Sequence, residues 1–128
     1  MKKYMLLQLI CLLCLLSCAK KDDFANINEF FTNWSVAVKN LDVKSLNKME
    51  NVSKLQQSYD IFYGEFYFKN IIVLNIKDMD KYFFVKFNGL IFNRFDNSSI
   101  PFFATAELVK VKNNFGYEIK NKTIYRSK

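Results

Sequence analysis

The chain has 128 residues, a formal net charge of +7, three cysteines, one proline and no histidine. This length fits one small domain that buries a core without disulfides. The lack of histidine excludes imidazole metal ligands and catalytic dyads with a histidine base. The cations are almost all lysines without a long basic cluster, so the charge does not indicate a nucleic-acid partner.

The first eighteen residues have the organisation of an export signal. Lys2 and Lys3 form a positively charged start, and an apolar run over residues 5–16 follows, interrupted only by Gln8. A bilayer span needs about 20 apolar residues, so this run is too short to cross a membrane. It predicts the hydrophobic region of a secretory signal peptide.

The end of the apolar run resembles a known processing motif. Residues 15–18 read LLSC, which resembles the lipobox of bacterial lipoproteins: an apolar residue, a small residue before the cleaved bond, and an obligatory cysteine. The resemblance implies that residues 1–17 are a cleaved signal peptide and that Cys18 carries the lipid, palmitate included. Cys11 and Cys14 then leave with the signal peptide. Each buried CH₂ contributes about 0.8 kcal/mol, so two or three acyl chains give effectively permanent membrane attachment.

The predicted lipid site also sets the domain organisation. Residues 18–23 are the lipidated cysteine and a tether, and residues 24–128 are a single domain. The tether after Cys18 reaches at most roughly 18 Å, so the domain stays close to the bilayer. The resemblance places the protein in the cell envelope, with the outer membrane favoured because Ala19 is not the aspartate that retains enteric lipoproteins at the inner membrane. The periplasmic and surface faces both stay open.

Two helices are predicted after the tether. Residues 24–40 predict an amphipathic helix, because apolar side chains recur at spacings of three and four. Asp22 or Asp23 is expected to cap its N-terminus, and Lys39 suits its C-terminal dipole. Asp42 is the expected cap of a second, shorter helix, and a third short turn is expected over residues 53–56. The apolar stripe of the first helix comprises Phe24, Ile27, Phe30, Phe31, Trp34, Ala37, Val38 and Leu41.

Aromatic and β-branched residues dominate from Tyr59 onward and predict β-strands. Asn70 is interpreted as a turn or as a bulge in one bent strand, and Gly89 as a bend. Residues 95–101 are predicted to be a loop, because Pro101 cannot occupy a central strand. The strands are expected at 59–68, 70–77, 82–95, 102–112 and 116–126. In the last strand the set Glu118, Lys120, Lys122, Ile124 and Arg126 is expected to face solvent.

The order of helix, short helix and curved antiparallel sheet resembles the NTF2-like fold. The resemblance covers residues 24–126 and implies an α+β domain with N-terminal helices packed on a curved, cone-shaped sheet. The sequence departs from the family over residues 53–70, where a third helix is short or missing. A cystatin-like helix-on-sheet domain is the alternative. The matching residues are Phe31, Trp34, Ala37, Asn40, Asp42, Leu46 and Met49, with Tyr117 and Ile119 in the last hairpin.

The sequence offers little for catalysis. It has no phosphate-binding loop and no carboxylate cluster with calcium-loop spacing, so no metal or cofactor is expected. The NTF2-like resemblance leaves one enzyme hypothesis, an isomerase like ketosteroid isomerase with a carboxylate base in an apolar cone. No residue of that catalytic set matches by position, so the chain is not expected to be an enzyme. The candidate carboxylates are Asp60, Glu65 and Glu107, of which burial would raise the pKa of Glu65, and the candidate donors are Tyr63 and Tyr117.

The abundance of aromatic residues has two interpretations. One is a phenylalanine-rich core. The other is a hydrophobic pocket in the cone that binds a lipid or a small apolar ligand, lined by Phe62, Phe66, Phe84, Phe103 and Tyr117. The leading prediction is a membrane-anchored, non-enzymatic binding or scaffold module with a protein partner in the envelope. The alternatives are a ligand-binding or isomerase-like protein that uses the cone, and a surface antigen that engages host molecules.

Overall fold

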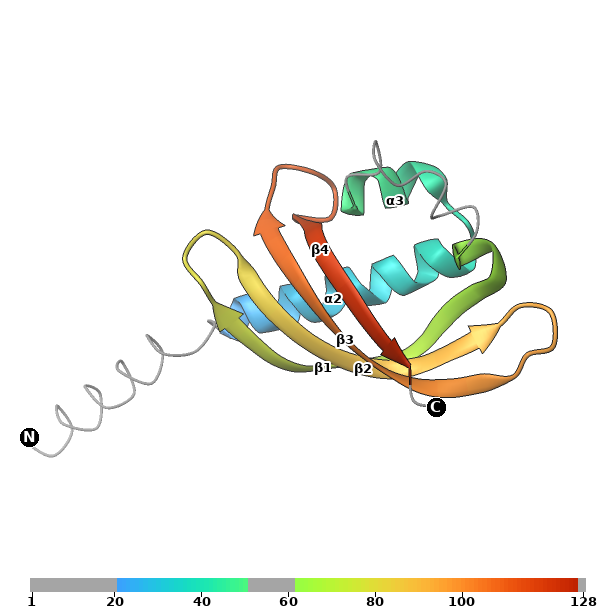
Figure 1. Cartoon of the computed structure of the whole chain (residues 1–128). Coiled ribbons are helices and arrows are strands. Elements are labelled where there is room, and N and C mark those ends of the chain that lie inside the picture. Colours follow the sequence, from blue (N-terminus) through green and yellow to red (C-terminus); the bar gives the residue numbers. More distant parts are fainter. Residues whose placement is uncertain (1–20, 51–61, 127–128) are drawn as a thin grey trace, which may run out of the picture.

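A computed structural model of the chain describes residues 21–50 and 62–126. The strands form one antiparallel sheet in the order β1-β2-β3-β4. The sheet curves around α2, which runs across one of its faces (Figure 1). The predicted class, N-terminal helices packed on a curved antiparallel sheet, is therefore confirmed. The elements are α2 (Lys21–Lys39), α3 (Val43–Met49), β1 (Phe66–Asp78), β2 (Phe83–Asn93), β3 (Ser99–Lys110) and β4 (Tyr117–Arg126).

The apolar stripe of α2 forms the centre of the core. Its side chains from Ile27 to Val38 that face the sheet are almost fully buried. The predicted stripe was wrong at its two ends. Phe24 is 42% exposed, and Leu41 lies beyond the helix in a left-handed backbone conformation. Asp22 and Asp23 lie inside the first turn of α2 and not at its cap. Negative charges in the first turn interact favourably with the helix dipole, so both aspartates still stabilise the helix.

Asp42 caps α3 as predicted. Its carboxylate accepts hydrogen bonds from the Ser45 amide at 3.2 Å and from the Ser45 hydroxyl at 2.7 Å. These bonds lower the pKa of Asp42 and keep the cap charged. Glu50 follows α3 in an extended conformation and forms an isolated parallel bridge with Ile119 of β4. The turn predicted over residues 53–56 lies outside the described residues.

The two strands predicted over 59–77 are one strand with two irregularities in its pairing to β2. Residues 62–65 form a helical turn, so the strand starts at Phe66 and not before it. Asn70 has a φ of 56°, and the β1–β2 register shifts between Lys69 and Ile72. The bulged backbone passes close to Gly89, where an added Cβ would lie 2.9 Å from the Lys69 carbonyl oxygen. The close approach of this backbone explains why a glycine occupies position 89.

Pro101 lies in a strand, contrary to the prediction of a loop. β3 begins at Ser99, and Pro101 pairs with Leu90 of β2. On the other side of β3, pairing with β4 extends only from Phe102 onward. Pro101 therefore has a described strand neighbour on one side only, which is the edge-like position that proline tolerates.

A bulge in β4 changes which face of that strand is buried. The β3–β4 register shifts between Glu107 and Leu108, so Lys120 is an extra residue on β4. Ile119 faces the core before the bulge, and Lys122 faces it afterwards, opposite the buried Ala106. The prediction that this set of β4 side chains faces solvent was therefore wrong for Lys122 and also for Ile124, which packs against the core opposite Ala104. Within the part of the chain that the structure describes, no helix is long and apolar enough to cross a membrane.

Candidate functional site

A buried carboxylate lies where the helices meet the sheet. Glu50, at the end of α3, is 4% exposed. Its Oε2 accepts hydrogen bonds from the indole N–H of Trp34 at 2.9 Å and from the hydroxyl of Tyr63 at 2.8 Å. Its Oε1 forms an ion pair with the ammonium group of Lys122. We call these four residues the Glu50 cluster.

The ammonium group of Lys122 is also enclosed by aromatic rings. It contacts the Tyr63 hydroxyl and lies 5.1 Å from the centre of the Tyr63 ring and 5.3 Å from that of Trp34. The Lys122 side chain is 18% exposed. Both charges of the pair are thus shielded from water and compensated by charge-assisted hydrogen bonds.

The cluster joins four segments that are far apart in the sequence. Trp34 comes from α2, Glu50 from the end of α3, Tyr63 from the turn before β1, and Lys122 from β4. Arg94, just after β2, supports this arrangement. Its guanidinium donates to the carbonyl oxygens of Val38, Lys39 and Tyr63 at 2.5, 2.9 and 2.7 Å. These bonds satisfy the last carbonyls of α2 and place Tyr63 against the helix end.

We expect Arg94→Lys to lower the free energy of unfolding by about 2 kcal/mol, because one ammonium group cannot reach three divergent carbonyls. Urea denaturation measures this change. The matched control is Arg126→Lys, whose guanidinium lies 5.7 and 5.3 Å from two phenyl rings. That exchange should cost less than about 1 kcal/mol. An Arg94→Lys protein as stable as the wild type would show that the carbonyl contacts contribute little.

The Glu50 cluster has acid, base and phenol groups but little access for a substrate. Both Glu50 oxygens already accept from protein donors, and the carboxylate is almost fully buried. A general acid or base must lie within hydrogen-bond reach of the reacting group. Among the described residues there is also no group of three or more side chains that could hold a metal ion. The arrangement favours a structural role, in which a polar network fixes one packing of helices on sheet.

The predicted catalytic residues are not brought together. Glu65 is exposed, so the expectation that it is buried among aromatic side chains was wrong. Glu107 lies on the outer face of the sheet and accepts a hydrogen bond from Asn121 at 2.9 Å. Asp60 lies outside the described residues. Of the two predicted donors, Tyr63 belongs to the Glu50 cluster, and Tyr117 lies elsewhere, at the β3–β4 turn.

The five predicted pocket residues likewise do not line one cavity. Phe62 and Phe66 contact each other with ring centres 5.3 Å apart, next to the core. Phe84 and Phe103 point to the outer face of the sheet, opposite the side that packs on α2. Tyr117 is buried against Phe30 of α2. Burial raises the pKa of Tyr117, and the nearby Asp23 carboxylate adds to that shift.

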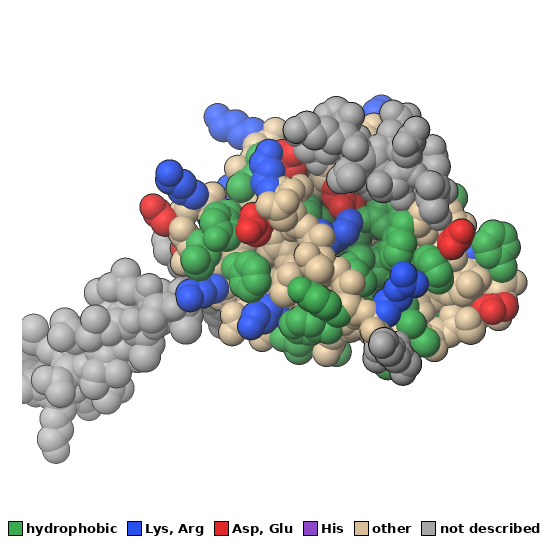
Figure 2. All heavy atoms as spheres, viewed as in Figure 1, with side chains coloured by type: hydrophobic (Ala, Val, Ile, Leu, Met, Phe, Trp, Pro, Cys, Tyr) green, Lys and Arg blue, Asp and Glu red, His purple; other side chains and the backbone are tan. Residues whose placement is uncertain are grey.

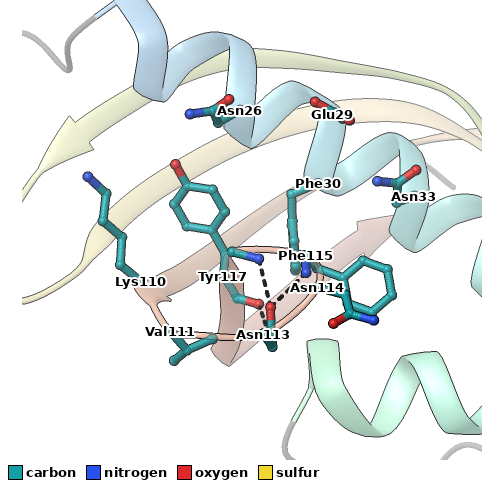
Figure 3. A pocket seen from close by; sticks show the side chains of 11 residues that line it. Asn26, Glu29, Phe30, Asn33, Lys110, Val111, Asn113, Asn114, Phe115 and Tyr117 are labelled. Atoms are coloured by element: carbon teal, nitrogen blue, oxygen red, sulfur yellow. Dashed lines mark hydrogen bonds between the residues drawn. The ribbon is translucent and has the colours of Figure 1, made fainter.

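The structure shows a polar cleft instead, between α2 and the turn that joins β3 to β4 (Figure 3). It is open to solvent and has a volume of about 480 Å³. Asn113 shapes the turn, because its side-chain oxygen accepts from the amides of Phe115 and Gly116 at 2.8 and 2.7 Å. Amide groups contribute much of the lining, so the cleft does not resemble the predicted apolar cone. Its walls include Asn26, Glu29, Asn33, Asn114, Phe115 and Tyr117.

Sequence reasoning missed Glu50 and Lys122. Glu50 has no distinctive neighbours in the sequence, and Lys122 follows an alternation that the bulge at Lys120 reverses. Comparison of the chain with protein-family models, with curated proteins and with solved structures gives no match.

Proposed function

We propose that this protein is a bacterial lipoprotein whose domain acts as a non-enzymatic binding or scaffold module at an envelope membrane. The observation that carries the proposal is the short sequence separation between the lipobox cysteine and the fold. The described part of α2 starts at Lys21, three positions after Cys18 in the sequence. This stretch reaches at most about 11 Å, less than the predicted tether over residues 18–23. Acyl chains on Cys18 would hold the start of α2 at the bilayer surface.

This attachment would orient the whole domain. The start of α2 and the β1–β2 turn lie at one end of the molecule, and the β2–β3 turn lies at the opposite end (Figure 1). Lys77 and Lys81 flank the β1–β2 turn and are exposed, but so are Asp78 and Asp80 between them, so the turn carries no net charge. The 19 residues of α2 extend over about 28 Å, so the β2–β3 turn would project away from the membrane.

An NTF2-like fold is part of the proposal. A second helix, α3, precedes a curved antiparallel sheet whose strands follow one another in sequence order. The cystatin-like alternative also places a helix on an antiparallel sheet, and α3 is the element that favours the NTF2-like arrangement. The saturated hydrogen bonding of the Glu50 cluster supports the non-enzymatic assignment.

We expect Cys18→Ser to abolish acylation, because serine does not supply the sulfur to which the lipid is joined. Metabolic labelling with palmitate should show no label in this variant, and the chain should leave the membrane fraction. Cys14→Ser is the matched control, since residue 14 would be removed with the signal peptide, and it should be labelled like the wild type. Label that persists on the Cys18→Ser chain would overturn the proposed anchor.

A further inference from the structure

The β2–β3 turn carries an exposed aromatic side chain. Phe95 is 82% exposed, the highest value among the large hydrophobic residues described. We propose that this turn is a docking element for a protein partner, which receives Phe95 in an apolar pocket with a basic rim. The inference deepens the proposed function, because membrane attachment through Cys18 would direct this turn away from the bilayer.

Local hydrogen bonds hold the turn in one conformation. The Asn93 side-chain oxygen accepts from the Phe95 amide at 2.8 Å, and the Asn97 amide donates to the Asn93 carbonyl at 2.9 Å. Asp96 accepts from both the amide and the hydroxyl of Ser98 at 2.9 and 2.6 Å. The backbone around Phe95 is thus ordered without any help from its ring. A turn whose backbone is already ordered loses little backbone conformational entropy on binding.

The base of the turn is fixed to the core. Arg94 precedes Phe95 and donates its guanidinium hydrogens to the three carbonyls at the end of α2 and at Tyr63. Its backbone amide donates to the Glu65 carbonyl at 2.8 Å. The cation next to Phe95 is therefore turned inward, and the exposed ring projects from a rigid support.

Acidic side chains flank the exposed ring. Asp96 follows it in the sequence, and the Arg94–Glu65 backbone contact brings the exposed Glu65 beside the turn. Figure 2 shows apolar atoms between acidic side chains at this end of the molecule. Hydrogen bonds from Ser98 lower the pKa of Asp96, which keeps it ionised. An acidic tip on a chain with a net charge of +7 favours a partner with a basic rim.

The shape and position of the β2–β3 turn favour a protein over other binding partners. A convex aromatic group needs a concave apolar site, and such buried aromatic anchors dominate the binding energy of protein interfaces. Carboxylates beside the ring disfavour insertion into an anionic membrane. The cleft between α2 and the β3–β4 turn mixes asparagine amides and charged groups with its apolar side chains, so it is not the apolar pocket that Phe95 of a second copy would need.

Photocrosslinking in intact cells tests the proposal on the full chain. The photoreactive amino acid p-benzoylphenylalanine replaces Phe95, and in the matched control it replaces Ile72, which is 59% exposed on the outer face of β1. We expect one discrete protein adduct at position 95 and none at position 72. Charge reversal by Glu65→Lys, which leaves the hydrogen bonds from Ser98 to Asp96 in place, should lower the adduct yield by about tenfold. The crosslinked partner peptide should lie next to lysine or arginine residues.

The other outcomes overturn the proposal. These outcomes are adducts with lipid, adducts of two copies of the chain, adducts unaffected by the charge reversal, and equal adducts at positions 72 and 95. Absence of any adduct at position 95 does so as well. Phe95→Ser should leave the melting temperature unchanged, which separates docking from folding. Palmitate labelling and fractionation of the same cells test the anchor independently, so each proposal can fail without the other.

Discussion

Glu50→Ala is expected to lower the free energy of unfolding by about 3–5 kcal/mol. The substitution leaves the shielded Lys122 ammonium without its counter-ion, and the donors of Trp34 and Tyr63 lose their common acceptor. Removing one partner of a buried ion pair costs this much because the remaining charge is uncompensated. Urea denaturation followed by tryptophan fluorescence measures the loss directly.

A double-mutant cycle separates the ion pair from general damage to the core. Glu50→Leu combined with Lys122→Met should cost clearly less than the sum of the two single changes, because the double variant leaves no buried charge. Lys120→Ala is the surface control, since its pair with Glu118 spans 3.4 Å and the Lys120 side chain is 46% exposed. That control should cost at most about 1 kcal/mol. Additive single costs would mean that Glu50 and Lys122 do not act as a pair.

The elements that the sequence predicted well are those with local signals. The apolar spacing of residues 24–40 predicted α2, and the position of Asp42 predicted the start of α3. Each signal involves residues within one or two helical turns, where the energetics of capping and side-chain burial are local. The bulge at Asn70 was among the predicted alternatives because asparagine tolerates a left-handed backbone.

The site was not predictable in the same way. The Glu50–Lys122 pair joins positions 72 residues apart, and no short-range pattern indicates that they meet. Strand alternation placed Lys122 on the solvent face, and one extra residue at Lys120 reversed that placement. Phe84 and Phe103 were predicted to line a pocket, but they lie on the outer face of the sheet. When strands have apolar residues on both faces, their sequence does not indicate which face the helix covers.

Trp34 is the position where the core and the Glu50 cluster meet, and its removal gives the second large expected effect. The side chain is fully buried on α2, and its ring stacks on Phe68 at 4.8 Å between centres and contacts Phe31 edge-on at 6.1 Å. Trp34→Ala should cost about 3–5 kcal/mol, since it opens a cavity among these rings and removes a donor to Glu50. Thermal or urea unfolding measures the loss.

Two further variants of α2 show which part of Trp34 matters. Trp34→Phe keeps most of the apolar volume but removes the indole N–H, so its cost of about 1–3 kcal/mol reflects the lost hydrogen bond to Glu50 plus a smaller cavity. Val36→Ala, on the exposed side of the same helix, should change stability by less than about 0.5 kcal/mol. If Trp34→Ala were as mild as Val36→Ala, α2 could not pack its apolar stripe on the sheet as described. The order of the three costs therefore tests the burial of the helix and the position of the Glu50 cluster together.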